Sequence, residues 1–251
     1  MPHKITKPAE ALAILLRADF TTQWRNRRSL LMSLLVPVML LLSWKGAADK
    51  LGGAFILSMS LTIGLTSIGI MGYAITLARD RDKGVFQRLR VAPVPTGLIM
   101  LSRIMVQLAL ITLVTLLVFY FGFKWDKISL SFQGYILSFL ASLIGGALYL
   151  SLGQMIVGLV KNAETVNATS RLVYIGFIVL GIFGESGLLG NSLKVLIHWS
   201  PFGTVKTLLS AGMMGTSWNA DTFGAFLLTL LYALIFGYLG VKWFRWSGTG
   251  K

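Results

Sequence analysis

Two long runs without a charged residue constrain the fold of this chain more than any other feature. They cover residues 53–78 and 104–123, and each is long enough to cross the hydrocarbon core of a bilayer, which takes about 20 apolar residues. Between them, from Arg79 to Arg103, lie six Lys or Arg residues and two Asp residues. A charged segment held between two such runs has to lie at a membrane surface. We therefore expect a protein that crosses the membrane more than once.

The composition supports a multi-pass membrane protein and argues against several other classes. Hydrophobic residues make up 55% of the chain, charged residues only 13%, and the mean hydropathy is +0.74, whereas soluble domains carry about 25% charged residues. The net charge of +14 does not indicate a nucleic-acid-binding protein, because the basic residues lie at the ends of apolar runs. The absence of Cys excludes disulfides, thiol catalysis and thiolate metal sites, and the two widely separated His residues give little support to a zinc site or a Ser/His triad.

We expect an all-α integral membrane protein in which residues 1–251 form a single domain with six transmembrane helices. Small and polar residues in the second span predict close packing inside a helix bundle. Only residues 172–184 separate Arg171 from Glu185, so the fifth span must begin near Thr165 or extend past Glu185. Asp221 is expected to cap the sixth span. The expected spans are residues 29–44, 53–78, 104–123, 132–160, the fifth span just described, and 222–243.

Two further helical segments are expected outside the spans. Residues 9–28 place Leu12, Leu16, Phe20 and Trp24 at intervals of four, with basic residues on another face, which predicts an amphipathic helix in the membrane interface. Residues 185–220 alternate glycine-rich breaks with short apolar pieces. This pattern predicts short, re-entrant-like helices between the fifth and sixth spans, on the outer side of the membrane.

The distribution of Lys and Arg predicts the orientation in the membrane. With six spans, 17 of the 23 basic residues fall on the side that holds both termini, and 6 fall on the other side. Because basic residues are enriched in cytoplasmic loops, we expect both termini and the Arg79–Arg103 segment to be cytoplasmic. The expected location is the plasma membrane of the cell.

The Arg79–Arg103 segment contains an amphipathic helical pattern of its own. Val85, Phe86 and Leu89 fall on one side at helical spacing, with four basic residues around them, and Pro93 and Pro95 are expected to end the helix. We expect this helix to lie against the membrane with its apolar edge outward, where a soluble partner can bind it.

Residues 80–93, DRDKGVFQRLRVAP, resemble the first cytoplasmic loop of the permeases of type-2 ATP-binding-cassette (ABC) transporters. The Ser200-Pro201-Phe202 turn and the basic, aromatic C-terminus are similar to that family as well. In the family, this loop is the coupling helix, which sits in a groove of a separate ATPase subunit. The sequence departs from the family pattern at Val85, where Thr is usual, and at Gln87, where Glu is usual and could pair with the ATPase.

The resemblance implies the membrane subunit of an ATP-driven exporter, with partner subunits and no enzyme activity of its own. Hydrolysis of ATP, with Mg, is expected in a separate ABC ATPase, because the chain carries no Walker A sequence and no cofactor site of its own. Nucleic acid is not expected as a partner, whereas membrane lipid is. The residues that the resemblance assigns to ATPase coupling are Asp80, Asp82, Gly84, Val85, Phe86, Gln87 and Leu89.

A transport path is expected at the interface with a second permease, identical or related, with the second and fifth spans nearest to it. Possible path residues are Gly64, Thr66, Gly69, Gly176 and Glu185, although these glycines and hydroxyls are equally compatible with packing inside one subunit. A path without a cluster of charges favours an amphiphilic or hydrophobic cargo, such as a drug, an antimicrobial or a lipid-like compound. The family also exports polysaccharides and ions.

Two other classes of function compete with this interpretation. A secondary transporter driven by an ion gradient needs carboxylates within the membrane, and Glu185 is the acidic residue closest to an apolar run. A position in the outer headgroups is the simpler interpretation of Glu185. An intramembrane lipid enzyme needs paired acid, base or metal groups, and Asp80 and Asp82 are neighbours of basic residues that favour a docking role instead.

Overall fold

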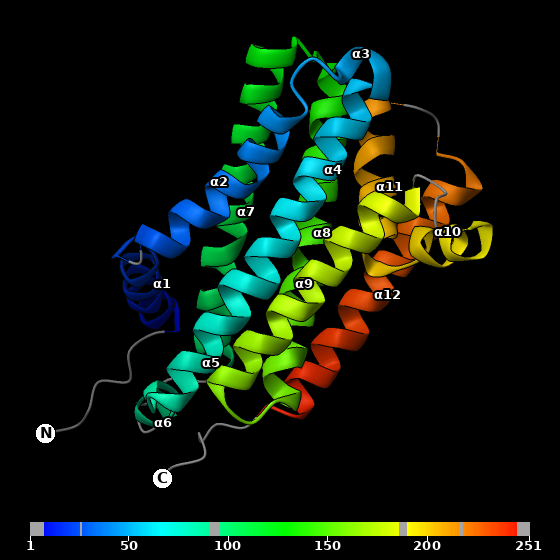
Figure 1. Cartoon of the computed structure of the whole chain (residues 1–251). Helices are drawn as coiled ribbons and strands as arrows, with labels where there is room; N and C mark the ends of the chain where they lie inside the picture. Colours follow the sequence, from blue (N-terminus) through cyan, green and yellow to red (C-terminus); the bar gives the residue numbers. More distant parts are fainter. Residues whose placement is uncertain (1–7, 26, 91–95, 186–189, 216–217, 245–251) are drawn as a thin grey trace, which may run out of the picture.

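The computed structural model describes residues 8–25, 27–90, 96–185, 190–215 and 218–244 (Figure 1). These residues form twelve α-helices and one π-helical segment, and they include no strand. In chain order the elements are α1 (Pro8–Arg25), α2 (Arg27–Ser43), α3 (Ala48–Leu51), α4 (Gly53–Thr66), η1 (Ser67–Ala74), α5 (Ile75–Asp82), α6 (Val85–Arg90), α7 (Thr96–Asp126), α8 (Phe132–Leu159), α9 (Ala163–Glu185), α10 (Asn191–His198), α11 (Pro201–Met214) and α12 (Ala220–Lys242).

Five helices in the described part of the chain are long and apolar enough to cross a membrane. The first of them joins α4, η1 and α5 into one continuous helix. The fifth expected span begins at Ala163, which is the earlier start among the two possibilities that its length left open. The described apolar part of α2, Ser33–Ser43, is shorter than these spans. The five are Gly53–Asp82, Leu98–Asp126, Phe132–Leu159, Ala163–Gly184 and Ala220–Lys242. The multi-pass helical fold is therefore confirmed, and a sixth span at α2 stays a prediction.

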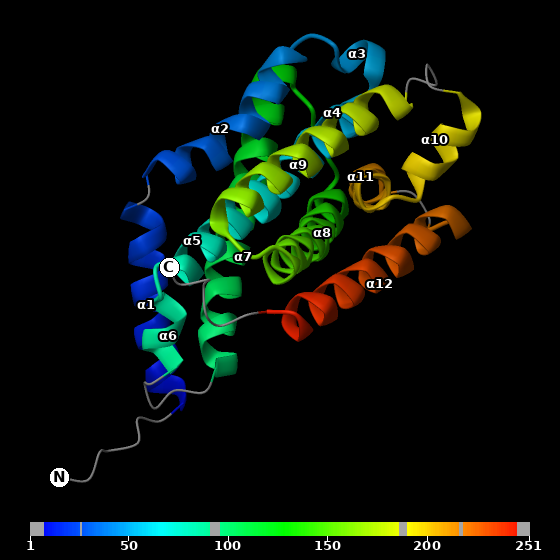
Figure 2. The ribbon, with the colours of Figure 1, turned by 60° about the horizontal axis from the view of Figure 1, so that its bottom comes forward.

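Helix α8 lies at the centre of the bundle and contacts α4, η1, α7, α11 and α12 (Figure 2). Its glycines allow these neighbours to approach closely: Gly146 faces Ile111 of α7, and the backbone of Gly153 faces that of Gly69 in η1. The second span is buried along most of its length, and its Thr62 and Thr66 are fully buried. The close packing predicted from its small and polar residues is therefore confirmed.

The connections between helices gather at two ends of the bundle. We call the end that holds the α5–α6 connection, the α8–α9 turn and the last turn of α12 the basic end (Figure 1). The opposite end holds α3, the α7–α8 connection and the short helices α10 and α11. At this opposite end, the backbone N–H of Gly46 donates to Oδ1 of Asp126 at 2.9 Å, which joins the connection after α2 to the end of α7. The sequence predicted this division of the connections.

Two short helices lie between α9 and α12, as expected. The Ser200 side chain caps α11 by accepting from the N–H of Gly203 at 3.2 Å, and Pro201 occupies the first helical position, where a missing N–H costs nothing. The expectation that Asp221 caps α12 is wrong. The cap is Asn219, whose Oδ1 accepts from the N–H of Thr222 at 2.8 Å, because Asn219 has the extended backbone of an N-cap while Asp221 is already helical.

Helix α1 packs along α7, and Ser102 joins the two helices by donating to Oδ2 of Asp19 at 2.6 Å. Phe20 and Trp24 are 54% and 59% exposed, and their rings stack with centroids 6.2 Å apart. An exposed aromatic pair beside basic residues is compatible with the interfacial position that the sequence predicts.

Candidate functional site

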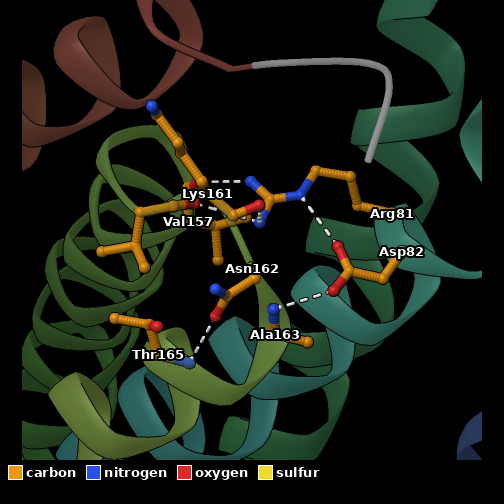
Figure 3. A network of polar contacts seen from close by, with 8 residues as sticks. Arg81, Asp82, Val157, Lys161, Asn162, Ala163 and Thr165 are labelled. Carbon is orange, nitrogen blue, oxygen red and sulfur yellow. Dashed lines mark hydrogen bonds and ion pairs between the residues drawn. The ribbon is translucent and has the colours of Figure 1, made fainter. Parts of the chain in front are cut away.

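Arg81 is buried at the basic end, although it lies in the most charged stretch of the chain. It stands in the last turn of α5 and is 1% exposed. Its Nη1 donates to the carbonyl of Val157 at 2.6 Å, and its Nη2 donates to the carbonyls of Val160 and Lys161 at 3.0 and 2.9 Å (Figure 3). Val157 lies in the last turn of α8, Val160 is its C-cap residue and Lys161 follows in the turn. The last peptide groups of a helix lack partners within it and carry partial negative charge. Arg81 thus caps α8 from a different span.

Asp82, the next residue, contacts the start of α9. Its Oδ2 accepts from the N–H of Ala163, the first residue of α9, at 2.8 Å (Figure 3). Asn162 supplies a second cap, because its Oδ1 accepts from the N–H of Thr165 at 2.7 Å. The first N–H groups of a helix carry partial positive charge, which a carboxylate stabilises. Two adjacent side chains of opposite charge therefore hold the end of α8 and the start of α9 against the end of α5.

The other aspartate of this stretch, Asp80, is also turned inward. Its Oδ2 lies 2.7 Å from Nη1 of Arg103, and the two side chains are 21% and 12% exposed. Arg103 belongs to α7, so this ion pair ties α5 to the next span. A pair this shielded from water is screened less by salt than a surface pair. Both aspartates therefore have structural partners within the chain, although Asp82 is exposed while Asp80 is only partly so.

Phe86 anchors α6 to the bundle. The sequence pattern placed it on an outward apolar edge, and this expectation is wrong, because its ring is fully buried. It packs edge-to-face against Phe244 with centroids 5.3 Å apart, and the guanidinium of Arg103 lies 4.7 Å from its centroid. The apolar side of this short helix therefore packs against α7 and against Phe244, just after α12. This packing is favourable because it removes the apolar surface of the ring from water.

The surface that α6 presents to solvent is polar. Among the described side chains from Lys83 to Arg88, the exposed ones are Lys83, Gln87 and Arg88, and we call these three the α6 outer surface. Gly84, with φ of 69°, makes the sharp turn that sets α6 off from α5, a backbone conformation that favours glycine. Val85 is half-buried beside it. The side chain of Leu89 lies outside the described residues, as do Pro93 and Pro95.

The possible path residues do not share one surface. Gly64 faces Pro37 of α2, Thr66 is fully buried with its hydroxyl donating to the carbonyl of Thr62 at 2.7 Å, and Gly69 faces the backbone of Tyr149. These three positions pack inside the subunit, which is the alternative that the sequence left open. Gly176 differs, because no atom lies within 4 Å of a Cβ added there. Glu185 is the last residue of α9, and its side chain lies outside the described residues.

The role of Arg81 was missed by the sequence reasoning, which treated it as a surface charge. A signal was present: Arg81 continues the helical face of Ala74 and Leu77, at spacings of seven and four residues, and both of these are fully buried. A long basic side chain that extends a buried face beyond the end of an apolar run has to find acceptors there. The ends of neighbouring helices are the nearest ones.

Comparisons with known proteins identify the family of this chain. Comparison with curated proteins gave no match. A family model described as ABC-2 type transporter matches residues 10–203, which is more than half of the chain and runs from α1 into α11. The matched residues include the whole α5–α6 segment and the α8–α9 turn that Arg81 and Asp82 hold. This chain therefore belongs to the ABC-2 type transporter family.

Proposed function

We propose that this chain is the permease subunit of an ATP-driven exporter, and that a separate ATPase subunit binds the α6 outer surface. The family in general implies a partner ATPase. The proposal takes ATP and Mg to bind in that partner, with no enzyme activity in this chain. Lys83, Gln87 and Arg88 offer charge and hydrogen bonds to the partner, whereas Phe86, which the sequence pattern places on the outward edge, is buried.

The observation that supports this proposal most is the pair of caps made by Arg81 and Asp82. They attach the base of α6 to the end of α8 and the start of α9, while Phe86 attaches α6 itself to α7. A force applied to α6 is therefore delivered to three spans through short contacts, of which those of Arg81 and Phe86 involve buried side chains. Packed helices move as rigid bodies between discrete arrangements, so a displaced α6 can switch the bundle between inward and outward states.

For the topology we propose six spans, with α2 as the first and with the basic end in the cytoplasm of the cell, at the plasma membrane. The support is the excess of basic residues at the basic end. The chain has no Cys, so a single introduced Cys reports its own side without background. Lys83→Cys should react with an impermeant maleimide only in opened cells, and Asp49→Cys should react in intact cells. The reverse pattern would contradict the orientation.

For the assembly we propose a second permease, identical or related, that packs on the open side of α9. This side exposes Leu172 by 73% and Ile175 by 56%, around the uncovered Gly176. The proposed cargo is an amphiphilic or hydrophobic compound, in keeping with the apolar spans, and export of a polysaccharide or an ion by the same fold is the alternative.

The experiment is to express the tagged chain alone and together with a candidate ABC ATPase from the same organism. If the proposal is correct, the ATPase co-purifies in a fixed ratio, and its hydrolysis rate depends on the permease. A stable permease that retains no ATPase under conditions in which both are folded would contradict the proposal. That result would favour transport driven by an ion gradient, which the variant Glu185→Gln then tests in transport assays.

A further inference from the structure

A polar cavity lies at the end of the bundle opposite α6, between α10, α11 and the start of α12. Its volume is about 540 Å³, which is within the range of small-molecule sites. The residues that line it include Lys194, His198, Lys206, Ser210 and Asn219.

The cavity has a positive character. Lys194 and His198 lie four residues apart on α10, so both side chains project from the same face into the cavity. Lys206 of α11 lines it as a buried cation, 8% exposed, with its Nζ 4.6 Å from the centroid of the Phe55 ring. The N-terminus of α12, capped by Asn219, opens at the same place and adds the positive end of its dipole.

Asp221 is the one carboxylate among the described residues that line the cavity. Its Oδ1 lies 2.9 Å from Nε2 of His198, so its charge is directed at the imidazole. Lys194, Lys206 and the N-terminus of α12 line the same cavity as this carboxylate. Hydroxyl donors from Thr207 and Ser210 complete a lining that can bind the oxygens of an anion.

The rim of the cavity is apolar. Val195 and Met214, which also line it, are 60% and 59% exposed. Large apolar side chains beside a cationic hollow, at the end of a bundle of membrane spans, match a ligand that has an acidic head and an apolar tail. An inorganic anion would make no use of this rim.

We propose that the cavity between α10, α11 and α12 binds the phosphate head of an anionic amphiphile, with the tail of the amphiphile lying along Val195 and Met214. The site does not depend on the proposed coupling to an ATPase, because α6 and this cavity lie at opposite ends of the bundle. Failure of one proposal therefore leaves the other standing.

The test uses the purified full chain in a neutral detergent, without an ATPase, and measures bound lipid by native mass spectrometry. Phosphatidylglycerol and phosphatidylcholine with the same acyl chains are added at equal concentrations, and inorganic phosphate is the competitor in a third arm. The expected result is one retained phosphatidylglycerol per chain, little phosphatidylcholine, and no displacement by phosphate at the concentration of the lipid.

The matched variants are Lys194→Ala, Lys206→Met and the control Lys50→Ala, which removes an exposed lysine from α3 at the same end. Size-exclusion profiles verify folding, and Lys194→Ala keeps the test valid if the buried Lys206 cannot be replaced. Loss of one charge-assisted hydrogen bond should weaken phosphatidylglycerol binding about tenfold, and Lys50→Ala should leave it unchanged. Equal binding by Lys194→Ala and Lys50→Ala would overturn the site. Displacement by equimolar phosphate would overturn the amphiphile and indicate a site for a free anion.

Discussion

Arg81 and Val157 are 76 residues apart in the sequence, yet Nη1 of Arg81 donates to the carbonyl of Val157 at 2.6 Å. Asp82, the next residue, caps the start of α9. Together the two contacts attach the end of α5, which leads into α6, to the turn between α8 and α9. The proposed transmission of force depends on these two side chains more than on α6 itself.

Replacing Arg81 by Met should destabilise the bundle by about 3 kcal/mol, because the carbonyls at the end of α8 lose a buried charged partner. The measurement is the apparent Tm of the detergent-solubilised chain. Arg79→Met is the matched control, since Arg79 is exposed on the same helix and its loss should leave the Tm nearly unchanged. Equal Tm values for the two variants would show that the contact does not contribute to stability.

Replacing Asp82 by Ala should remove the cap on α9 at a cost of about 1 kcal/mol. Asp82→Asn should cost less, because an amide oxygen still accepts from the N–H of Ala163 while the charge is lost. Both changes can be followed by hydrogen exchange in the first turn of α9. If Asp82→Ala leaves exchange at Ala163 and its neighbours as slow as in the native chain, the cap is not formed in solution.

Phe86→Ala should destabilise the chain by about 3 kcal/mol, because the ring is fully buried between Arg103 and Phe244. Arg88→Glu should leave the Tm unchanged and weaken binding of the ATPase, since Arg88 lies on the α6 outer surface. The two readouts, Tm and co-purified ATPase, separate anchoring from docking. If Phe86→Ala keeps the native Tm but no longer binds the ATPase, Phe86 contacts the ATPase, as the outward apolar edge in the sequence pattern predicted.

Gly69→Ala should be severely destabilising, because a Cβ there would lie 2.5 Å from the carbonyl oxygen of Tyr149. Gly176→Ala is the paired control in another span, where nothing lies within 4 Å of the added Cβ. Removing glycine from a helix interior should there stabilise the chain by about 0.5–1 kcal/mol. Expression level and Tm report both effects, and a tolerated Gly69→Ala would refute the close contact of η1 with α8.

Much of the fold could be predicted from the sequence, because bilayer thickness fixes the length of a span. Length alone required the fifth span either to begin near Thr165 or to extend past Glu185, and the structure shows the first of these; the burial of the second span followed from residues such as Thr62 and Gly69. The third span was placed too late. α7 begins at Thr96, and Arg103 lies inside it, because the partner Asp80 compensates a charge that the hydrophobic pattern treats as a boundary.

The candidate site could be located from the sequence, but its orientation could not be predicted. The amphipathic pattern around Phe86 identifies a helix with an apolar side, and it contains no information on whether that side meets a partner or its own bundle. The capping roles of Arg81 and Asp82 depend on where α8 and α9 end in space, which local spacing does not specify. Asn219 and Asp221 were both acceptable caps by residue type, and only backbone conformation distinguishes them.

The central claim, that the ATPase binds at α6, is tested most directly by a cross-link from a single position. Because the chain has no Cys, Gln87→Cys carries one thiol on the α6 outer surface, and Asp49→Cys carries one at the opposite end. With a short thiol-reactive photo-cross-linker and the co-expressed ATPase, we predict a cross-linked permease–ATPase product from Gln87→Cys alone. A product from Asp49→Cys, or none from Gln87→Cys in a complex that still co-purifies, would contradict the account.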